Sequence, residues 1–172
     1  MKTHDLTHIA LMAAFLCIFA PISIPIPISS VSLTLSTFIL CLTAYILKPR
    51  QALAAVGIYL LLGSTGLPVF SGYMAGISRF AAPGGGYLIG YLFLAGISGW
   101  FIQKYPDLPT QMLGMFLGIL VMDLLGTFWM AVSTGISFLA AIPTGFLAFL
   151  PFDILKIILA SYIGRNIQKQ IK

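Results

Sequence analysis

Apolar residues run along this chain in six stretches, which are separated by prolines, glycines or a few basic residues. A helix needs about 20 mainly apolar residues to cross the hydrocarbon core of a membrane. The sequence therefore predicts six membrane-spanning helices that are short and closely spaced. Their expected ranges are 7–20, 31–47, 51–62 or slightly beyond, 86–103, 110–132 and 144–163.

The segment that follows the first stretch is not expected to be helical. Pro21, Pro25 and Pro27 each remove a backbone donor and restrict the residue before them. We therefore predict an extended segment between the first two helices.

Composition supports a membrane protein. The chain has 172 residues, of which 59% are hydrophobic and 8% charged, and its mean hydropathy of +1.04 lies far outside the soluble range. The apolar character continues beyond the first stretch, so this stretch is expected to be retained rather than cleaved as a signal. The expected fold is all-α, with residues 1–172 forming a single transmembrane domain.

Basic residues predict the orientation, because short loops rich in Lys and Arg stay on the cytoplasmic side. With the N-terminus inside, only Arg79 falls outside among the basic residues of the loops and termini. Both termini are therefore predicted to be cytoplasmic. The basic residues on that side are Lys2, Lys48, Arg50, Lys104, Arg165, Lys169 and Lys172.

The connection at 63–85 is expected to face outward. It is rich in glycine, proline and aromatic residues, and loops of this length in a compact protein are usually functional or disordered. Its apolar character counts against disorder. We predict a lid over an outward-facing cavity, with a plain connector as the alternative.

Two opposite charges, Asp153 and Lys156, lie inside the last apolar stretch of a chain that has only four acidic residues. Residues three apart share a helix face. At about 1.5 Å per residue, Asp153 and Asp123 fall roughly 14 Å below the outer ends of their helices and Lys156 roughly 18 Å. Charges at such depth are costly and usually functional. We predict a polar ligand site here; a self-satisfied network that only fixes helix register is the alternative, especially for Asp123.

Residues of the outer connection are candidates for the upper part of this site. Arg79 is a candidate anchor for an anionic group, or alternatively a contact for lipid headgroups. Phe70, Tyr73, Phe80 and Tyr87 are candidates for an apolar wall or for an interfacial aromatic belt. Tyr87 is the strongest of them, since it follows the run of three glycines at 84–86.

A second candidate surface lies on the first helix. Ala10 and Ala14 are four residues apart, and small residues at this spacing let another helix approach closely. The same spacing is common by chance, as in Gly86/Gly90 and Gly114/Gly118. Alone, it is a weak indication of a partner-binding surface.

Other motifs are absent from the sequence. It has no G-x-x-x-x-G-K-[ST] phosphate loop. His4 and His8 are far from the polar layer, and Cys17 and Cys41 lack ligand-spaced partners, so neither histidine chemistry nor a zinc site is expected. We predict that the chain is no enzyme, needs no cofactor or metal, and draws any energy for transport from a gradient or another subunit.

The order of these features resembles the BioY biotin family, among the S components of energy-coupling-factor (ECF) vitamin transporters. The resemblance covers nearly the whole chain and is specific as a set. Its motifs are Ile-Pro-Ile-Pro at 24–27 with Leu-Thr-Leu at 33–35, Gly-Leu-Pro-Val at 66–69, Pro83 with Gly-Gly-Tyr at 85–87, Asp123 with Thr-Gly-Ile-Ser at 134–137, and Pro-Phe-Asp-Ile-Leu-Lys at 151–156.

The resemblance implies a multi-pass protein of the bacterial plasma membrane that captures biotin from outside. Asp153 and Lys156 match the ligand-binding Asp-x-x-Lys of the family. They would accept from the ureido N–H groups and donate to the ureido oxygen, while Arg79 would hold the carboxylate and Tyr87 the apolar part. Ala10 and Ala14 would dock on a transmembrane coupling protein that carries two ATPase subunits.

Three positions depart from the family pattern. Ser36 replaces a glutamine, Met74 an asparagine and Leu88 a basic residue. Arg79 is a candidate replacement for the missing cation, but a related vitamin such as lipoate is an alternative substrate. A carrier driven by an ion gradient, with Asp123 and Asp153 as ion sites, is the alternative from another class.

Overall fold

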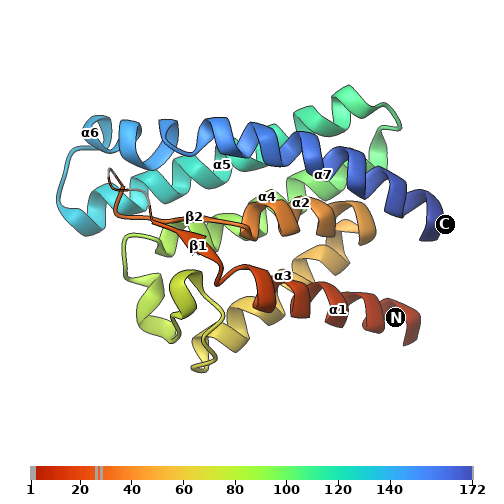
Figure 1. Cartoon of the computed structure of the whole chain (residues 1–172), viewed down its shortest axis with the longest axis horizontal. Helices are drawn as coiled ribbons and strands as arrows, with labels where there is room; N and C mark the ends of the chain where they lie inside the picture. The colour runs from red at the N-terminus through yellow and green to blue at the C-terminus, as the bar shows by residue number, and fades with distance from the viewer. Residues whose placement is uncertain (1–2, 26, 28, 172) are drawn as a thin grey trace.

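The computed structural model describes residues 3–25, 27 and 29–171, so the orientation predictions for Lys2 and Lys172 lie outside the described residues. The chain is mainly helical. Figure 1 shows the helices aligned with the long axis, with α1 beginning and α7 ending at the same end of the molecule. The helices are α1 (Thr3–Phe19), α2 (Ser36–Ile46), α3 (Pro49–Ser64), α4 (Gly85–Lys104), α5 (Leu108–Thr134), α6 (Phe138–Ile142) and α7 (Leu150–Ile171).

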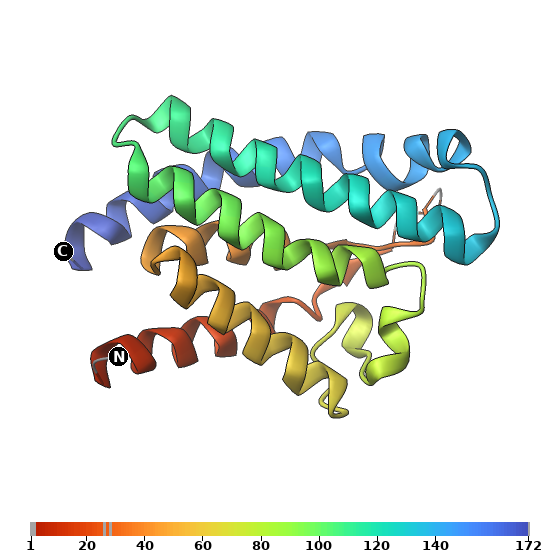
Figure 2. The ribbon, with the colours of Figure 1, turned by 180° about the vertical axis from the view of Figure 1, so that it is seen from behind.

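Helix α4 is central to the packing. It contacts α5, α3 and α2, while α7 packs against α2, and α1 against α3. Figures 1 and 2 show α5 and α7 on one side of the molecule and α1 and α3 on the other. Segments 85–104, 108–134 and 138–170 are long and apolar enough to cross a membrane, and α1 and α2 are shorter apolar helices.

Local sequence explains where α5 begins and ends. Asp107 caps it by accepting a hydrogen bond from the backbone N–H of Thr110 at 2.9 Å, and Pro109 occupies its first turn, where no intrahelical donor is needed. The helix ends at Thr134, and the next residue, Gly135, has a φ of 73°, the left-handed conformation usual after a helix.

The second apolar stretch contains a shorter helix than predicted. Only Ser36–Ile46 is helical, while Leu33–Thr34 forms strand β2 and pairs antiparallel with strand β1, Ser23–Ile24. The extended segment after α1 is thus confirmed for its described residues, and Ile26 and Ile28 lie outside them. The predicted helix start at 31 is wrong: apolar and polar residues alternate from Val31 to Leu35, which is typical of a strand, but the run is too short to separate from the apolar stretch that follows it.

The last apolar stretch is also divided differently. It comprises α6, a π-helical turn η3 (Pro143–Leu147) and α7, which continues to Ile171. Pro143 and Pro151 lack the backbone donor that a continuous α-helix uses, so α7 begins only at Leu150 and not at 144. The predicted end at 163 is wrong because the polar residues after it continue the helix beyond the apolar stretch.

Glycines let α4 and α5 approach closely. A side chain on Gly86 would meet the backbone oxygen of Leu125 at 2.7 Å, and one on Gly90 would meet Met122 Cα at 2.9 Å. Gly86 and Gly90 therefore form a small-residue face at which α4 packs closely against α5. The sequence alone did not distinguish this spacing from a chance match.

The connection between α3 and α4 is folded at the end of the molecule away from the termini, as Figure 2 shows. It contains two short 3₁₀ turns, η1 (Ser71–Tyr73) and η2 (Ile77–Phe80). Gly72 N–H donates to Pro21 O at 3.0 Å, and Gly76 N–H donates to Gly63 O at 2.8 Å. These bonds tie the connection to the segment after α1 and to the end of α3.

Candidate functional site

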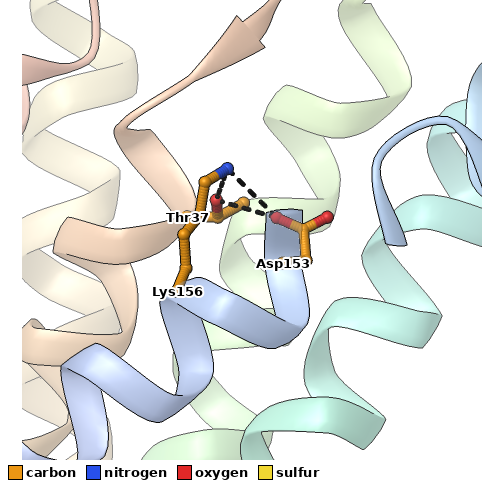
Figure 3. Close-up of polar contacts among 3 residues, drawn as sticks. All are labelled: Thr37, Asp153 and Lys156. Atoms are coloured by element: carbon orange, nitrogen blue, oxygen red, sulfur yellow. Dashed lines mark hydrogen bonds and ion pairs between the residues drawn. The ribbon is translucent and has the colours of Figure 1, made fainter. Parts of the chain in front are cut away.

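A buried polar cluster joins α2 to α7. Lys156 Nζ lies 3.1 Å from Asp153 Oδ1 and donates to Thr37 Oγ1 at 2.8 Å. Thr37 Oγ1 in turn donates to Asp153 Oδ1 at 3.2 Å. Figure 3 shows the three side chains meeting between the two helices. Each hydrogen bond of this triangle involves a charged partner, which makes it stronger than a neutral one.

The local sequence explains how the triangle forms. Asp153 and Lys156 are three residues apart on α7 and therefore project from the same face. Thr37 lies in the first turn of α2, the helix that α7 packs against. All three residues are buried. Thr37 was not predicted, because one hydroxyl in an apolar stretch is a weak signal and its partner lies 116 residues away in the sequence.

Asp123 lies on α5 and faces the same region. It is only 1% exposed, and its Oδ2 has no hydrogen-bond partner among the described residues. A buried carboxylate oxygen without a partner is costly, so this atom is available to a ligand or water. The structure therefore gives Asp123 a different environment from that of Asp153.

These groups line one cavity of about 100 Å³. The structure brings together all five residues that were predicted to bind substrate; that they contact a ligand stays a prediction. Most of the wall is apolar, with a few polar groups, as is usual for small-molecule sites. The predicted residues are Arg79, Tyr87, Asp123, Asp153 and Lys156, and the apolar wall includes Phe70, Leu88, Tyr91, Met122 and Phe149.

Tyr87 is held rigidly in the wall. Its hydroxyl donates to Gly145 O and lies 3.4 Å from Thr127 Oγ1, and its ring contacts Phe149 edge-on. Because the hydroxyl is used within the protein, Tyr87 offers mainly its ring to the cavity. That the ring forms an apolar contact with a ligand stays a prediction.

Arg79 reaches the cavity from η2, in the outer connection. Leu88, at the position where the family pattern has a basic residue, lines the same cavity. Phe70 also lines it, whereas Phe80 packs edge-on against Phe70. Tyr73 is 67% exposed and lies outside the cavity lining. The interpretation of Tyr73 as part of the wall is therefore wrong, and its alternative place in an interfacial aromatic belt stays a prediction.

The segment Val31–Thr34 forms part of the cavity lining that the sequence did not predict. It includes strand β2, which was expected to be helix. A polar–apolar pattern over so few residues gives no indication that they lie beside a ligand site. Pairing with β1 places the segment there.

Ala10 and Ala14 lie on α1, away from this cavity. Both are exposed, whereas Ala13 is buried against the rest of the protein. The predicted small-residue face is thus open along α1. Its use by a partner stays a prediction.

Comparison with known proteins identifies the family of this chain. A family model described as the BioY family matches residues 1–172. The chain belongs to the BioY family.

Individual BioY proteins match over most of their length. "Biotin transporter BioY2" of Lactococcus lactis subsp. cremoris is 36% identical over 165 residues, which cover 95% of this chain and 89% of that protein. "Probable biotin transporter BioY" of Pyrococcus horikoshii is 34% identical and covers 98% of both chains. The crystal structure of the S-component for biotin from an ECF-type ABC transporter is 29% identical, covers 98% of this chain and 95% of that chain, and superposes with a TM-score of 0.91.

Membership of the BioY family confirms three of the broader predictions. The chain has the S-component fold, is a multi-pass membrane protein and is a transport protein rather than an enzyme. The resemblance inferred from scattered short motifs is confirmed by a match over the whole chain.

Proposed function

We propose that this chain is the substrate-binding subunit of an ECF-type importer of the bacterial plasma membrane and that it captures biotin from outside. The observation that carries this proposal is the cavity whose floor is the Thr37–Asp153–Lys156 triangle. The near-complete structural match to an S-component for biotin supports it.

The charges of the cavity suit the two ends of biotin. Asp153 accepts from the ureido N–H groups, and Lys156 donates to the ureido oxygen while balancing the aspartate. Thr37 holds both groups in position. Asp123 Oδ2, which has no partner among the described residues, is a further acceptor on the floor. Tyr87 contributes the apolar wall.

Arg79 is proposed to hold the biotin carboxylate. Arg79 lines the same cavity as Leu88 but comes from the outer connection. It can therefore supply the positive charge that Leu88 does not provide. A guanidinium binds a carboxylate through two parallel hydrogen bonds. The connection then acts as a lid that carries one ligand contact.

Calorimetric titration of biotin and of lipoate into the purified chain tests the substrate. Biotin is expected to bind tightly, and lipoate at least tenfold more weakly, because its dithiolane ring has no N–H groups for Asp153. Tighter binding of lipoate by folded protein would contradict the biotin assignment and would make Ser36, Met74 and Leu88 marks of a different substrate. Uptake by the chain alone that stops when the ion gradient collapses would favour the gradient-driven carrier.

We also propose six spans, with both termini in the cytoplasm. Helix α1 begins and α7 ends at one end of the molecule, and the α2–α3 and α4–α5 connections, which carry basic residues, lie at that end too, whereas the α3–α4 connection, whose turn η2 contains Arg79, lies at the other end. A cysteine introduced at Gln170 is expected to react with a membrane-impermeant thiol reagent only in inside-out vesicles, and one at Ile77 only in right-side-out cells. Labelling of both from the same side would exclude this topology.

The proposed partners are a transmembrane coupling protein and two ATPase subunits. Ala10 and Ala14 present an exposed small-residue face on α1, and such a face lets a partner helix approach closely. Residues 1–172 would then act as one domain that binds the vitamin, while the partners supply the energy.

A further inference from the structure

A second cavity lies at the opposite end of the molecule from the proposed biotin site. It has a volume of about 390 Å³ and lies between the end of α4, the α4–α5 turn and the last turns of α7. Three cations line it, namely Lys104, Arg165 and Lys169, and its described lining contains no carboxylate. The cations come from two helices distant in the sequence, so the fold itself brings them together.

Hydrogen bonds fix the walls of this cavity. Gln111 Nε2 donates to Tyr105 O at 2.8 Å, and Gln168 Nε2 donates to Tyr45 O at 3.1 Å. Arg165 Nη2 donates to Pro106 O at 3.2 Å. A guanidinium has five N–H donors, and this bond uses one. Arg165 is therefore positioned by the α4–α5 turn while most of its donors remain for an anion.

Aromatic side chains place this cavity at the level of the lipid headgroups. Lys104 Nζ lies 4.5 Å from the centre of the Trp100 ring and 5.4 Å from that of Tyr105. Trp and Tyr gather at the membrane–water interface, where their rings meet the apolar layer and their polar ends meet water. Trp100 is also 47% exposed on the side of α4. The cationic cavity thus lies where lipid phosphates are located.

Asp107 is a carboxylate near the three cations. Asp107 caps α5 outside the cavity lining, and hydrogen bonds from Thr110 hold its pKa below the usual range, so that it is ionised at neutral pH. Arg165 is close enough to interact with it electrostatically. Among the described residues of this region, three positive charges against one negative charge leave a net charge of about +2.

We propose that this cavity binds the phosphate of an anionic membrane lipid. Basic pockets between membrane helices are suited to anionic headgroups, which offer phosphate oxygens to Lys and Arg. The ligand chemistry is that of a phosphate with one net negative charge, and the location at headgroup depth favours a lipid over phosphate from solution. This site does not depend on the biotin assignment.

Native mass spectrometry of the purified chain tests the proposal. Phosphatidylglycerol is expected to be retained at least tenfold more strongly than phosphatidylcholine. The double variant Arg165→Gln/Lys169→Gln is expected to lose at least fivefold in affinity for phosphatidylglycerol. The matched control Lys48→Gln/Arg50→Gln removes two charges at the same end of the molecule, outside this cavity lining, and is expected to change that affinity less than twofold.

Asp107→Asn provides a test in the opposite direction. Asparagine caps a helix about as well as aspartate, so this variant removes the opposing charge without removing the cap, and lipid affinity is expected to rise at least twofold. Equal losses in the two double variants, or equal retention of the two lipids, would overturn the site. Inorganic phosphate that displaces the lipid at equal concentration would overturn the lipid assignment in favour of a free phosphate. An unchanged midpoint of thermal unfolding in the same detergent shows that each variant is folded.

Discussion

Replacing Asp153 with asparagine is expected to weaken biotin binding by roughly 10–100-fold, because hydrogen bonds to charged groups contribute about 1.5–3 kcal/mol and the neutral amide accepts less strongly. Asparagine keeps the size of the side chain and one oxygen that accepts from Lys156 and Thr37. The loss in thermal stability is therefore expected to be much smaller than the loss in affinity. Calorimetry and thermal unfolding in the same detergent measure the two effects.

The control for this variant is Asp107→Asn, which makes the same chemical change at an exposed helix cap. It is expected to leave biotin affinity unchanged. If Asp153→Asn reduces stability as much as it reduces binding, Asp153 serves to join α2 and α7 and not to bind the ligand. This is the alternative in which the buried network only fixes helix register.

Replacing Ala14 with tryptophan is expected to abolish biotin uptake in cells that supply a coupling protein and its ATPases, while biotin binding by the purified chain changes less than twofold. Ala14 is exposed on α1, so the larger side chain projects away from the protein core. An indole at this position keeps a partner helix from approaching closely. Uptake of labelled biotin and co-purification of the coupling protein measure the effect.

A matched control is Leu124→Trp on α5, which places the same bulk at another exposed apolar position. It is expected to retain uptake. Normal uptake by Ala14→Trp would show that the coupling protein does not use this face of α1. Loss of uptake in both variants would indicate a general effect of bulk on the membrane-facing surface.

Hydropathy located most of the helices but not their ends. The predicted range 86–103 closely matches α4, Gly85–Lys104, because this helix is apolar over most of its length and ends in the polar pair Gln103 and Lys104. The range 31–47 failed at its start because Leu33–Thr34 pairs with Ser23–Ile24. Strand pairing depends on a partner elsewhere in the chain, and apolar periodicity carries no information about that partner.

Only part of the site was predicted from the sequence, because its other residues are brought in by contacts between distant segments. Asp153 and Lys156 are conspicuous because charges are costly in an apolar helix, and their spacing alone places them on one face. Thr37 is uncharged and lies far from both residues in the sequence. Its role follows only from the packing of α2 against α7, which brings its hydroxyl to both charged groups.

The sequence by itself determined that the chain is a helical membrane protein, that its last helix carries a pair of opposite charges, and that its motifs are those of one family. Apolar length, charge placement and short-range spacing are local properties, so they can be read without the fold. Only the tertiary structure decided that Arg79 and Leu88 line the same cavity, that β2 forms part of its wall, and that the end of α4 and the last turns of α7 enclose a cationic cavity. These features join segments far apart in the chain, and long-range packing determines which of them meet.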